Sequence, residues 1–308
     1  MNTKISIIVP VFNSCSFLPK LLLAIDEQRI ISNWNLELIL VDDGSKDNSF
    51  EQIIELQKQY SYIKGIKLSR NFGHQVAVRT GLQYASGEYV AIIDDDLQDP
   101  PSILPGFFEY LDKGYDVAYG VRRKRKESFF KKFSYNAFYR ILQKLSNIEI
   151  PLDTGDFCVM KKVVVDKMLL LNEKNPFLRG IRAWVGYKQI GVQYERQARL
   201  EGESGYTISK LLKIAADGIF SFSKIPIRFI TYLGVVGLII AIIYSVFVIT
   251  LKLMGELPEK GYATIILLIS FFGSLTLICL GIIGEYVVRI YDETQNRPHS
   301  IVGETINI

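Results

Sequence analysis

Three adjacent carboxylates, Asp94, Asp95 and Asp96, follow an apolar run of strand character at 89–93. Like charges this close repel one another, so the cluster needs a counter-ion. In an extended segment, Asp94 and Asp96 point to the same side. Two oxygen ligands at that spacing suit Mg²⁺ or Mn²⁺, which also takes phosphate oxygens and neutralises a leaving diphosphate. The structural alternative is an acidic turn ahead of Pro100.

Two further sets of carboxylates could also do chemistry. Asp42 and Asp43 end another apolar run, where a carboxylate can accept hydrogen bonds from a base N–H or a ribose hydroxyl. The alternative is a plain turn in which Gly44 supplies backbone freedom. Asp156 follows Gly155 in what reads as a polar turn, and both a catalytic and a structural role stay open for it.

Basic residues form two sets that could bind phosphate. One is the run 122–126, and the other comprises Arg179, Arg182, Arg196 and Arg199. Arginine side chains suit phosphate because they bind it as forks, although each alone could be a solvated surface charge. The two histidines, His74 and His299, are too few and too far apart to indicate a metal site.

The elements that must position these residues alternate regularly. Apolar runs with strand character lie at 5–11, 36–41, 63–68 and 89–93, and helical periodicity occupies 17–30, 49–60 and 75–85. This alternation predicts an α/β fold, a doubly wound and mainly parallel sheet with helices on both faces. Ligands bind beyond the carboxyl ends of such strands, where the aspartates lie. Neither a glycine-rich dinucleotide fingerprint nor a Walker A motif is present.

The pattern after residue 113 is less regular. We expect strands at 115–119 and 190–194 and a helix at 129–145. An apolar stripe along 206–226 predicts an amphipathic helix in the membrane interface, with a core-facing helix as the alternative.

The mean hydropathy of +0.18 is high for a chain with 22% charged residues. Two uncharged stretches, 229–251 and 261–284, explain it. Each would extend about 35 Å as a helix, enough to cross a hydrocarbon core of about 30 Å. We therefore predict a cytoplasmic domain at 1–205, an interface helix at 206–226, and a membrane domain at 227–308 that ends in a cytoplasmic C-terminal tail. Flanking Lys and Arg residues place both termini in the cytoplasm.

Composition narrows the class of protein. A net charge of +4 does not suggest a nucleic-acid binder. The three cysteines have no metal-like spacing, and we interpret them as free thiols in a reducing compartment. The N-terminus does not have the pattern of a signal peptide.

The order of the motifs resembles that of polyprenyl-phosphate glycosyltransferases of glycosyltransferase family 2, the group of dolichol-phosphate mannose synthases and bactoprenol glucosyltransferases. The resemblance is carried by the segments 9–13, 41–45, 68–75, 94–101, 154–157 and 202–204 and by the paired C-terminal spans. It implies a GT-A fold, a nucleotide-sugar donor and Mg²⁺ or Mn²⁺.

Roles for individual residues follow from the resemblance together with the patterns above. Asp156 falls at the family's catalytic aspartate. The residues expected to bind the nucleotide are Pro10, Phe12, Asn13, Asp42, Asp43, Asp94 and Asp95. Those expected to hold the metal and diphosphate are Asp94, Asp96 and Gln98. Those expected to bind the acceptor phosphate are Arg122, Arg196, Arg199 and Ser204. Two departures remove a cation near that phosphate, because Cys158 and Gly205 stand where the family commonly has Arg and Lys.

The expected reaction is an inverting, metal-dependent transfer of one sugar, most simply from UDP-glucose, to undecaprenyl phosphate at the cytoplasmic face of a bacterial inner membrane. The product would serve cell-envelope glycan modification. N-acetylhexosamine or mannose are alternative sugars, and oligomerisation stays open. A processive polysaccharide synthase and a non-catalytic membrane scaffold or flippase subunit are the rival interpretations.

Overall fold

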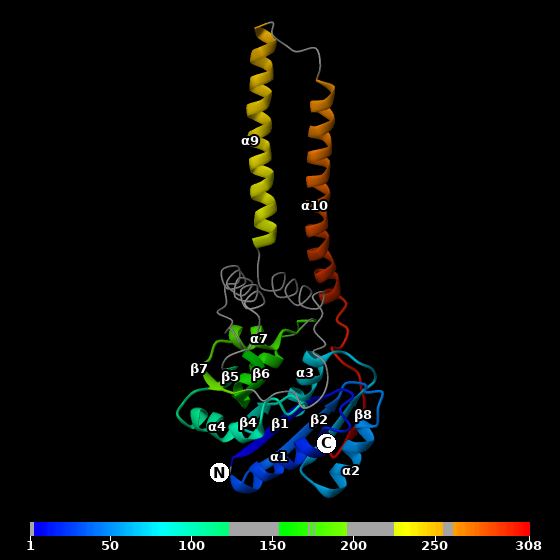
Figure 1. Cartoon of the computed structure of the whole chain (residues 1–308), viewed down its shortest axis with the longest axis vertical. Helices are drawn as coiled ribbons and strands as arrows, with labels where there is room; N and C mark the ends of the chain where they lie inside the picture. The colour runs from blue at the N-terminus through cyan, green and yellow to red at the C-terminus, as the bar shows by residue number, and fades with distance from the viewer. Residues whose placement is uncertain (1–2, 123–153, 172, 175, 196–224, 255–260) are drawn as a thin grey trace. The chain divides into compact units, whose positions relative to one another are not determined.

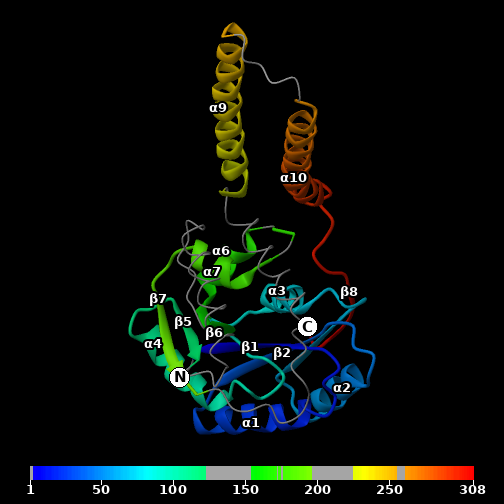
Figure 2. The same cartoon turned by 45° about the horizontal axis from the view of Figure 1, so that its top comes forward.

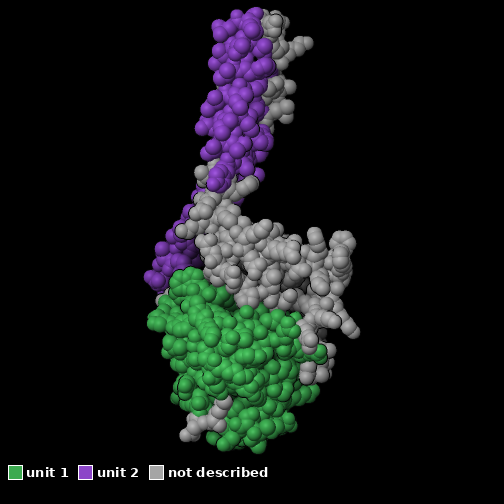
Figure 3. All heavy atoms as spheres, turned by 90° about the vertical axis from the view of Figure 1, so that its left-hand side faces the viewer, with its two compact units in different colours: residues 1–143, 148–210, 297–308 green, residues 144–147, 211–296 purple. Residues whose placement is uncertain are grey.

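The computed structural model describes residues 3–122, 154–171, 173–174, 176–195, 225–254 and 261–308 (Figure 1). The chain divides into two compact units, coloured separately in Figure 3. We call residues 1–143, 148–210 and 297–308 the sheet unit, and residues 144–147 and 211–296 the helical unit. The expected helix at 129–145 and most of the expected interface helix at 206–226 lie outside the described residues.

The sheet unit is built on an eight-stranded sheet in the order β7-β5-β6-β4-β1-β2-β3-β8. The strands are β1 Lys4–Val11, β2 Asn35–Asp42, β3 Ile63–Leu68, β4 Tyr89–Ile92, β5 Val117–Arg122, β6 Thr154–Lys161, β7 Gln189–Tyr194 and β8 Val302–Ile306. The pairs β1–β2, β1–β4, β2–β3 and β5–β7 are parallel, and β4–β6, β5–β6 and β3–β8 are antiparallel. The sequence prediction of a mainly parallel α/β sheet is therefore confirmed, with antiparallel strands added to it.

Helices cover both faces of this sheet (Figure 2). They are α1 Leu18–Ile31, α2 Ser49–Gln59, α3 His74–Tyr84, the short 3₁₀ helix η1 Pro101–Ile103, α4 Leu104–Asp112, α6 Lys162–Leu169 and α7 Leu178–Trp184. Helices α1, α2 and α4 share one hydrophobic cluster, and α3, α6 and α7 share the other. In β1 and β2 every residue after the first is buried, as expected for continuous apolar strands between two helical layers.

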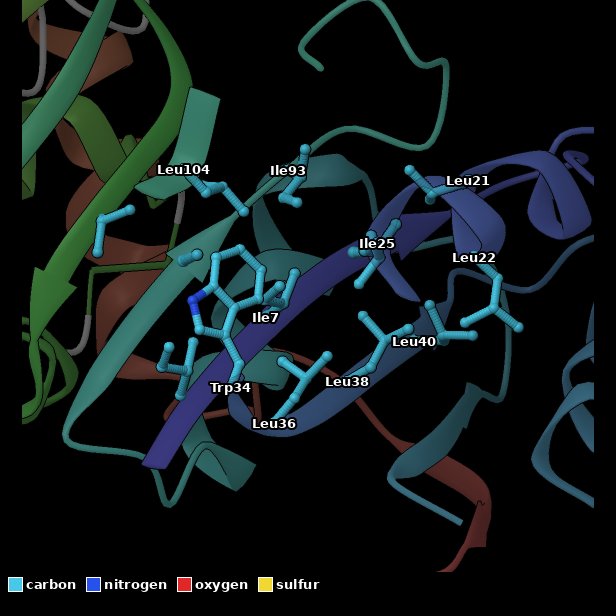
Figure 4. Close-up of a cluster of buried hydrophobic side chains, with 14 of the residues drawn as sticks. Ile7, Leu21, Leu22, Ile25, Trp34, Leu36, Leu38, Leu40, Ile93 and Leu104 are labelled. Carbon is cyan, nitrogen blue, oxygen red and sulfur yellow. The ribbon is translucent and has the colours of Figure 1, made fainter. Parts of the chain in front are cut away.

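Trp34 lies in the first of these clusters, between β1 and α4. Figure 4 shows its ring beside Ile7, Leu36 and Leu104. The ring packs edge-on against Phe108 of α4, with 5.4 Å between the centroids. This contact fixes α4 against the strands that carry the aspartates.

The helical unit contains α9 Ile225–Leu253 and α10 Tyr262–Thr294. The stretches Tyr232–Leu251 and Phe271–Thr294 are long and apolar enough to cross a membrane, and none of these windows is buried in protein. The uncharged stretches at 229–251 and 261–284 predicted both helices. Helix α10 continues beyond the second stretch into a charged segment that includes an ion pair between Glu285 and Arg289.

Two strands were missed by the sequence analysis. Residues 154–157 were interpreted as a polar turn, but Thr154–Lys161 is strand β6, buried along nearly its whole length. The end of the chain was interpreted as a tail of the membrane domain. Residues 297–308 instead belong to the sheet unit, where β8 pairs with the edge strand β3. The chain thus enters and leaves the helical unit from the same sheet.

Candidate active site

The carboxyl ends of β4, β1 and β2 lie side by side because these strands are parallel neighbours. The loops that follow them carry the aspartates at 94–96, the segment 12–14 and the pair Asp42 and Asp43. The sequence-predicted donor residues therefore meet at one edge of the sheet.

Asp95 joins two of these loops. Its Oδ2 accepts a hydrogen bond from the Ser14 hydroxyl at 2.5 Å and one from the Phe12 backbone N–H at 3.4 Å. Burial raises the pKa of Asp95, although the bond from Ser14 opposes the rise. Asp95 therefore fixes the loop after β1, in which Phe12 is 44% exposed.

Asn13 joins the loop after β1 to the loop after β2. Its backbone adopts φ +52°, its N–H donates to Ser45 Oγ at 2.9 Å, and its Oδ1 accepts from the Lys46 N–H at 2.8 Å. Pro10 is buried within β1, opposite Val41 of β2.

The neighbours Asp42 and Asp43 have different surroundings. Asp43 accepts hydrogen bonds from the backbone N–H groups of Phe72 at 2.7 Å and Gly73 at 2.9 Å, so its carboxylate holds the loop after β3. Asp42 is fully buried, and its Oδ1 accepts from the Ser45 N–H at 3.2 Å. Its Oδ2 has no hydrogen-bond partner among the described residues. A buried acceptor without a partner is costly, which suits Asp42 to a donor group on a ligand.

Asp94 and Asp96 flank the start of a turn. Sequence analysis treated this segment as extended, but the chain turns at Asp95, and Leu97 has φ +57°. Burial raises the pKa of Asp94 to about 6. Asp96 Oδ1 accepts a hydrogen bond from the Gln98 N–H at 3.1 Å.

The chemistry of this donor set fits a divalent cation. Within the described part of the chain, no three His, Cys, Asp or Glu residues gather around one point. A cation such as Mg²⁺ commonly uses only one or two carboxylates and takes its other ligands from water and substrate phosphates. Asp94 and Asp96 would supply that number, and the amide oxygen of Gln98 would be a further hard ligand.

Asp156 is held in place by three side chains. It is 8% exposed; its Oδ2 accepts from Gln75 Nε2 at 2.7 Å and its Oδ1 from Arg179 Nε at 2.9 Å. His74 Nε2 lies 3.3 Å from Oδ2. Burial alone would raise the pKa of Asp156, but the positive charge of Arg179 and the hydrogen bond from His74 hold it well below its usual range. Asp156 is therefore an oriented carboxylate anion.

His74 is the residue whose role sequence analysis missed. Its Nε2 lies 3.3 Å from Asp156 and 3.7 Å from Asp94 Oδ1, so it bridges the expected catalytic and metal-binding carboxylates. Burial lowers its pKa, but the bond to Asp156 and the charge of Asp94 raise the pKa to about 9. The imidazolium thus offsets part of the negative charge. The family motif at 68–75, which contains His74, was the sequence signal available for this role. The spacing of His74 and His299 could not show that Asp94 and Asp156 are neighbours of His74.

Gln75 extends the same arrangement to α7. Its Oε1 accepts from the backbone N–H of Leu178 at 3.0 Å, while its Nε2 donates to Asp156. On α7, Arg179 also donates to the Thr154 carbonyl at 2.8 Å. The first turns of α3 and α7 therefore converge on β6 at Asp156.

The residues predicted to bind phosphate, other than Arg182, divide into three groups. Arg179 is engaged by Asp156, as described above. Arg122, at the end of β5, has its guanidinium so close to Gly155 that a Cβ there would lie 2.7 Å from Nη2. Burial lowers the pKa of Arg122, but Tyr194 and Asp99 outweigh this effect and raise it. Arg196, Arg199, Ser204 and the rest of the run at 122–126 lie outside the described residues.

Arg182 and Cys158 bear on one departure from the family pattern. The Cys158 thiol is buried, and burial raises its pKa despite the nearby charge of Arg182. The Arg182 guanidinium lies beside this thiol and 4.8 Å from the centroid of the Tyr119 ring. Helix α7 thus supplies a cation next to the position where the family commonly has an arginine.

Comparisons with known proteins identify the class to which this site belongs. Residues 6–169 match the family described as Glycosyl transferase family 2. The chain therefore belongs to glycosyltransferase family 2 and is a glycosyltransferase with a GT-A fold.

Several relatives match over almost the full chain. The chain is 42% identical over 308 residues to "Uncharacterized glycosyltransferase YkcC" of Bacillus subtilis (strain 168), covering 100% of this chain and 95% of that protein. It is 36% identical over 300 residues to "SfII prophage-derived bactoprenol glucosyl transferase" of Shigella flexneri, covering 97% of each. Among solved structures, mannosyltransferase PcManGT of Pyrobaculum calidifontis, in complex with GDP-Man and Mn²⁺, matches with a TM-score of 0.45 and 20% identity, over 63% of this chain and 55% of that chain.

Proposed function

We propose that this protein transfers one sugar from a nucleotide sugar, UDP-glucose in the simplest case, to the phosphate of undecaprenyl phosphate, with inversion at the anomeric carbon. The observation that carries the proposal is the position of His74. Its Nε2 lies within 4 Å of both Asp94, at the donor side, and Asp156, at the expected acceptor side. The relatives named bactoprenol glucosyl transferase support a polyprenyl acceptor.

On the donor side, the unpartnered Oδ2 of Asp42 accepts a hydrogen bond from the base or ribose of the nucleotide. Asp94, Asp96 and Gln98 hold a divalent cation, which when bound supplies positive charge to the leaving nucleoside diphosphate. His74 places a further positive charge between Asp94 and Asp156. These residues bind the donor and favour departure of the diphosphate.

On the acceptor side, a phosphate monoester has a second pKa near 6 and is mostly dianionic at neutral pH. Little proton removal is then needed before its oxygen attacks the anomeric carbon. Asp156, which Gln75 and Arg179 hold as an anion, orients the acceptor. Arg122 supplies positive charge beside Gly155, where the acceptor phosphate would bind.

We further propose that α9 and α10 both cross the bacterial inner membrane and that the sheet unit lies in the cytoplasm. Strand β8 supports this arrangement. Because residues before α9 and residues after α10 build one sheet, both ends of the helical unit must emerge on the same side. The Lys and Arg residues that flank the helices favour the cytoplasmic side.

The proposal is tested by incubating membranes that contain the protein with undecaprenyl phosphate and separate nucleotide sugars. Mass spectrometry of the lipid identifies the sugar and counts it. We expect one added hexose, and loss of the product on chelation of divalent cations. A ladder of masses would favour a processive synthase, and no product from any donor would favour a non-catalytic scaffold.

A further inference from the structure

The last residues of the chain, Arg297–Ile308, contact the start of one active-site loop and the helix that follows this loop. We call them the C-terminal segment, and residues 69–73 the β3–α3 loop. At the start of the loop, the Ser69 N–H donates to the Ile301 carbonyl at 2.9 Å. Beyond its end, Thr80 Oγ1 of α3 lies 2.7 Å from Ser300 Oγ, a hydroxyl–hydroxyl hydrogen bond. Adjacent residues of the segment, Ser300 and Ile301, therefore contact the start of the loop and the helix after it.

The C-terminal segment is itself anchored along the whole of β3. Strand β8 of this segment pairs with β3 from Gly65 to Leu68. The two strands pack closely, since a Cβ at Gly65 would lie 3.0 Å from Ile306 Cδ1. The Asn307 side chain donates to the carbonyl of Ser61 at 2.8 Å and to that of Ile63 at 2.9 Å. The segment is thus a firm support for the β3–α3 loop.

The loop after β2 holds the β3–α3 loop from another direction. Asp43 accepts the Phe72 and Gly73 N–H groups. Gly44, at φ +64°, is packed so closely that a Cβ would lie 2.4 Å from the backbone of Arg70. Because the β3–α3 loop leads directly into His74 and Gln75, these supports determine where both side chains meet Asp156.

We propose that the C-terminal segment is a positioning element for the catalytic site. By fixing the β3–α3 loop, Ser300 and Ile301 keep His74 and Gln75 in contact with Asp156. This inference rests on the proposed function, because it assigns Asp156 to the transfer reaction. It also connects the membrane anchor to the site, since only Gln295 and Asn296 separate the segment from α10.

The simpler explanation for β8 is protection of a sheet edge, since an unpaired edge strand invites aggregation. That explanation accounts for the pairing of β8 with β3. It does not account for the contact of Ser300 with Thr80, because Ser300 lies outside β8 and Thr80 lies on a helix. The two explanations make different predictions for substitutions at Ser300.

The test uses the full-length protein with four variants: Ser300→Ala, Ser300→Thr, Val302→Pro and, as a control, Thr305→Ala. Thr305 lies on the same strand with an exposed side chain. Loss of one hydrogen bond in Ser300→Ala should lower kcat about fivefold, with the donor KM within about twofold of wild type. Ser300→Thr should restore kcat. Val302→Pro disrupts the pairing of β8 with β3 beside Ile301, because proline cannot donate a backbone hydrogen bond. This variant should lower kcat by more than about tenfold.

Hydrogen exchange supplies a measurement that does not depend on the substrate. In Ser300→Ala and Val302→Pro, amides of the β3–α3 loop should exchange faster than in wild type, while amides of β1 should exchange at the wild-type rate. In the control variant Thr305→Ala, the loop amides should also exchange at the wild-type rate. Unchanged loop exchange in Val302→Pro, or wild-type kcat in both variants, would overturn the proposal. Faster exchange throughout the sheet would also overturn it, in favour of edge protection. If wild type itself transfers no sugar, the proposed function fails, and loop exchange still decides whether the segment fixes the loop.

Discussion

Glu37 offers a quantitative test of the electrostatics at the amino ends of the strands, opposite the candidate site. The side chain is 3% exposed on β2. Its Oε1 accepts from Ser6 Oγ at 2.5 Å and from the Ser86 N–H at 2.6 Å. Its Oε2 accepts from Ser86 Oγ at 2.7 Å and pairs with Lys64 at 3.1 Å and Lys4 at 3.2 Å. One carboxylate therefore joins the starts of β1 and β2, β3 and the turn before β4.

The effect of Glu37 on stability can be estimated from its pKa. Burial alone would raise the pKa, but hydrogen bonds from Ser6 and Ser86 lower it from 4.5 to about 2. At 1.36 kcal/mol per unit, the ionised form contributes about 3 kcal/mol to the free energy of unfolding. Because the folded-state pKa is depressed, this contribution is complete above about pH 4.5 and is lost as the pH falls through 2.

We predict that Glu37→Gln lowers the free energy of unfolding by about 3 kcal/mol at pH 7. For a unit of this size, that corresponds to a fall in Tm of about 6–12 °C. The assay is thermal unfolding of the detergent-solubilised protein, followed by tryptophan fluorescence, which reports on the buried Trp34. Glu109→Gln is the matched control, because Glu109 forms an exposed pair with Lys113 and should change Tm very little.

The pH dependence separates this account from a simple packing defect. The difference in Tm between wild type and Glu37→Gln should narrow as the pH falls from 5 to 3, because the unfolded chain, in which Glu37 has its ordinary pKa of 4.5, takes up a proton there while folded Glu37 stays ionised. A Tm at pH 7 equal to that of wild type would refute the reasoning. So would a difference in Tm that stays constant down to pH 3.

Four further predictions concern the site, with the exposed carboxylate variant Asp166→Asn as a common control that should behave as wild type. Asp156→Asn should lower kcat about 100-fold with a nearly unchanged donor KM, and near-normal turnover would contradict its assignment. Asp42→Ala should raise the donor KM at least about tenfold, because it removes one hydrogen bond between the nucleotide and a charged group. Its kcat should change less than its KM. Asp96→Asn should raise the divalent-cation concentration needed for half-maximal activity, and an unchanged metal titration would exclude Asp96 as a ligand. Arg179→Lys keeps the charge but loses the fork that joins Asp156 to Thr154, so kcat should fall about tenfold and remain above that of Arg179→Ala.

The first half of the fold could be predicted because most residues of its strands are apolar and buried. The expected strand at 63–68 coincides with β3, and the other early elements differ by a residue or two at their ends. Parallel pairing then brings the polar ends of β1, β2 and β4 together, so Asp42 and Asp94 could be placed at one edge from sequence alone.

Strands β6 and β8 could not be predicted in the same way. Strand β6 begins with Thr154, Gly155 and Asp156, which read as a turn because their partners, Gln75 and Arg179, are distant in sequence. Strand β8 is short and largely exposed, and its pairing with β3 compensates for its weak pattern. In both cases the strand depends on contacts that no local pattern encodes.

The surroundings of the site residues depend on similar contacts. Asp43 and Asp95 stay predicted nucleotide ligands, and in the structure their carboxylates also accept hydrogen bonds from backbone and hydroxyl groups of neighbouring loops. Conversely, His74 had no expected role and lies between Asp94 and Asp156. Residue type and spacing identify carboxylates at a strand end, but only tertiary contacts show which of their oxygens are engaged.

The most direct test of the account is the mass of the lipid formed when the purified protein is incubated to completion with undecaprenyl phosphate, UDP-glucose and a divalent cation. The account predicts one product, heavier than the acceptor by a single hexose and formed about 100-fold more slowly by Asp156→Asn. Recovery of only unmodified lipid with every nucleotide sugar supplied, or of a series of products that differ by successive sugars, would contradict it.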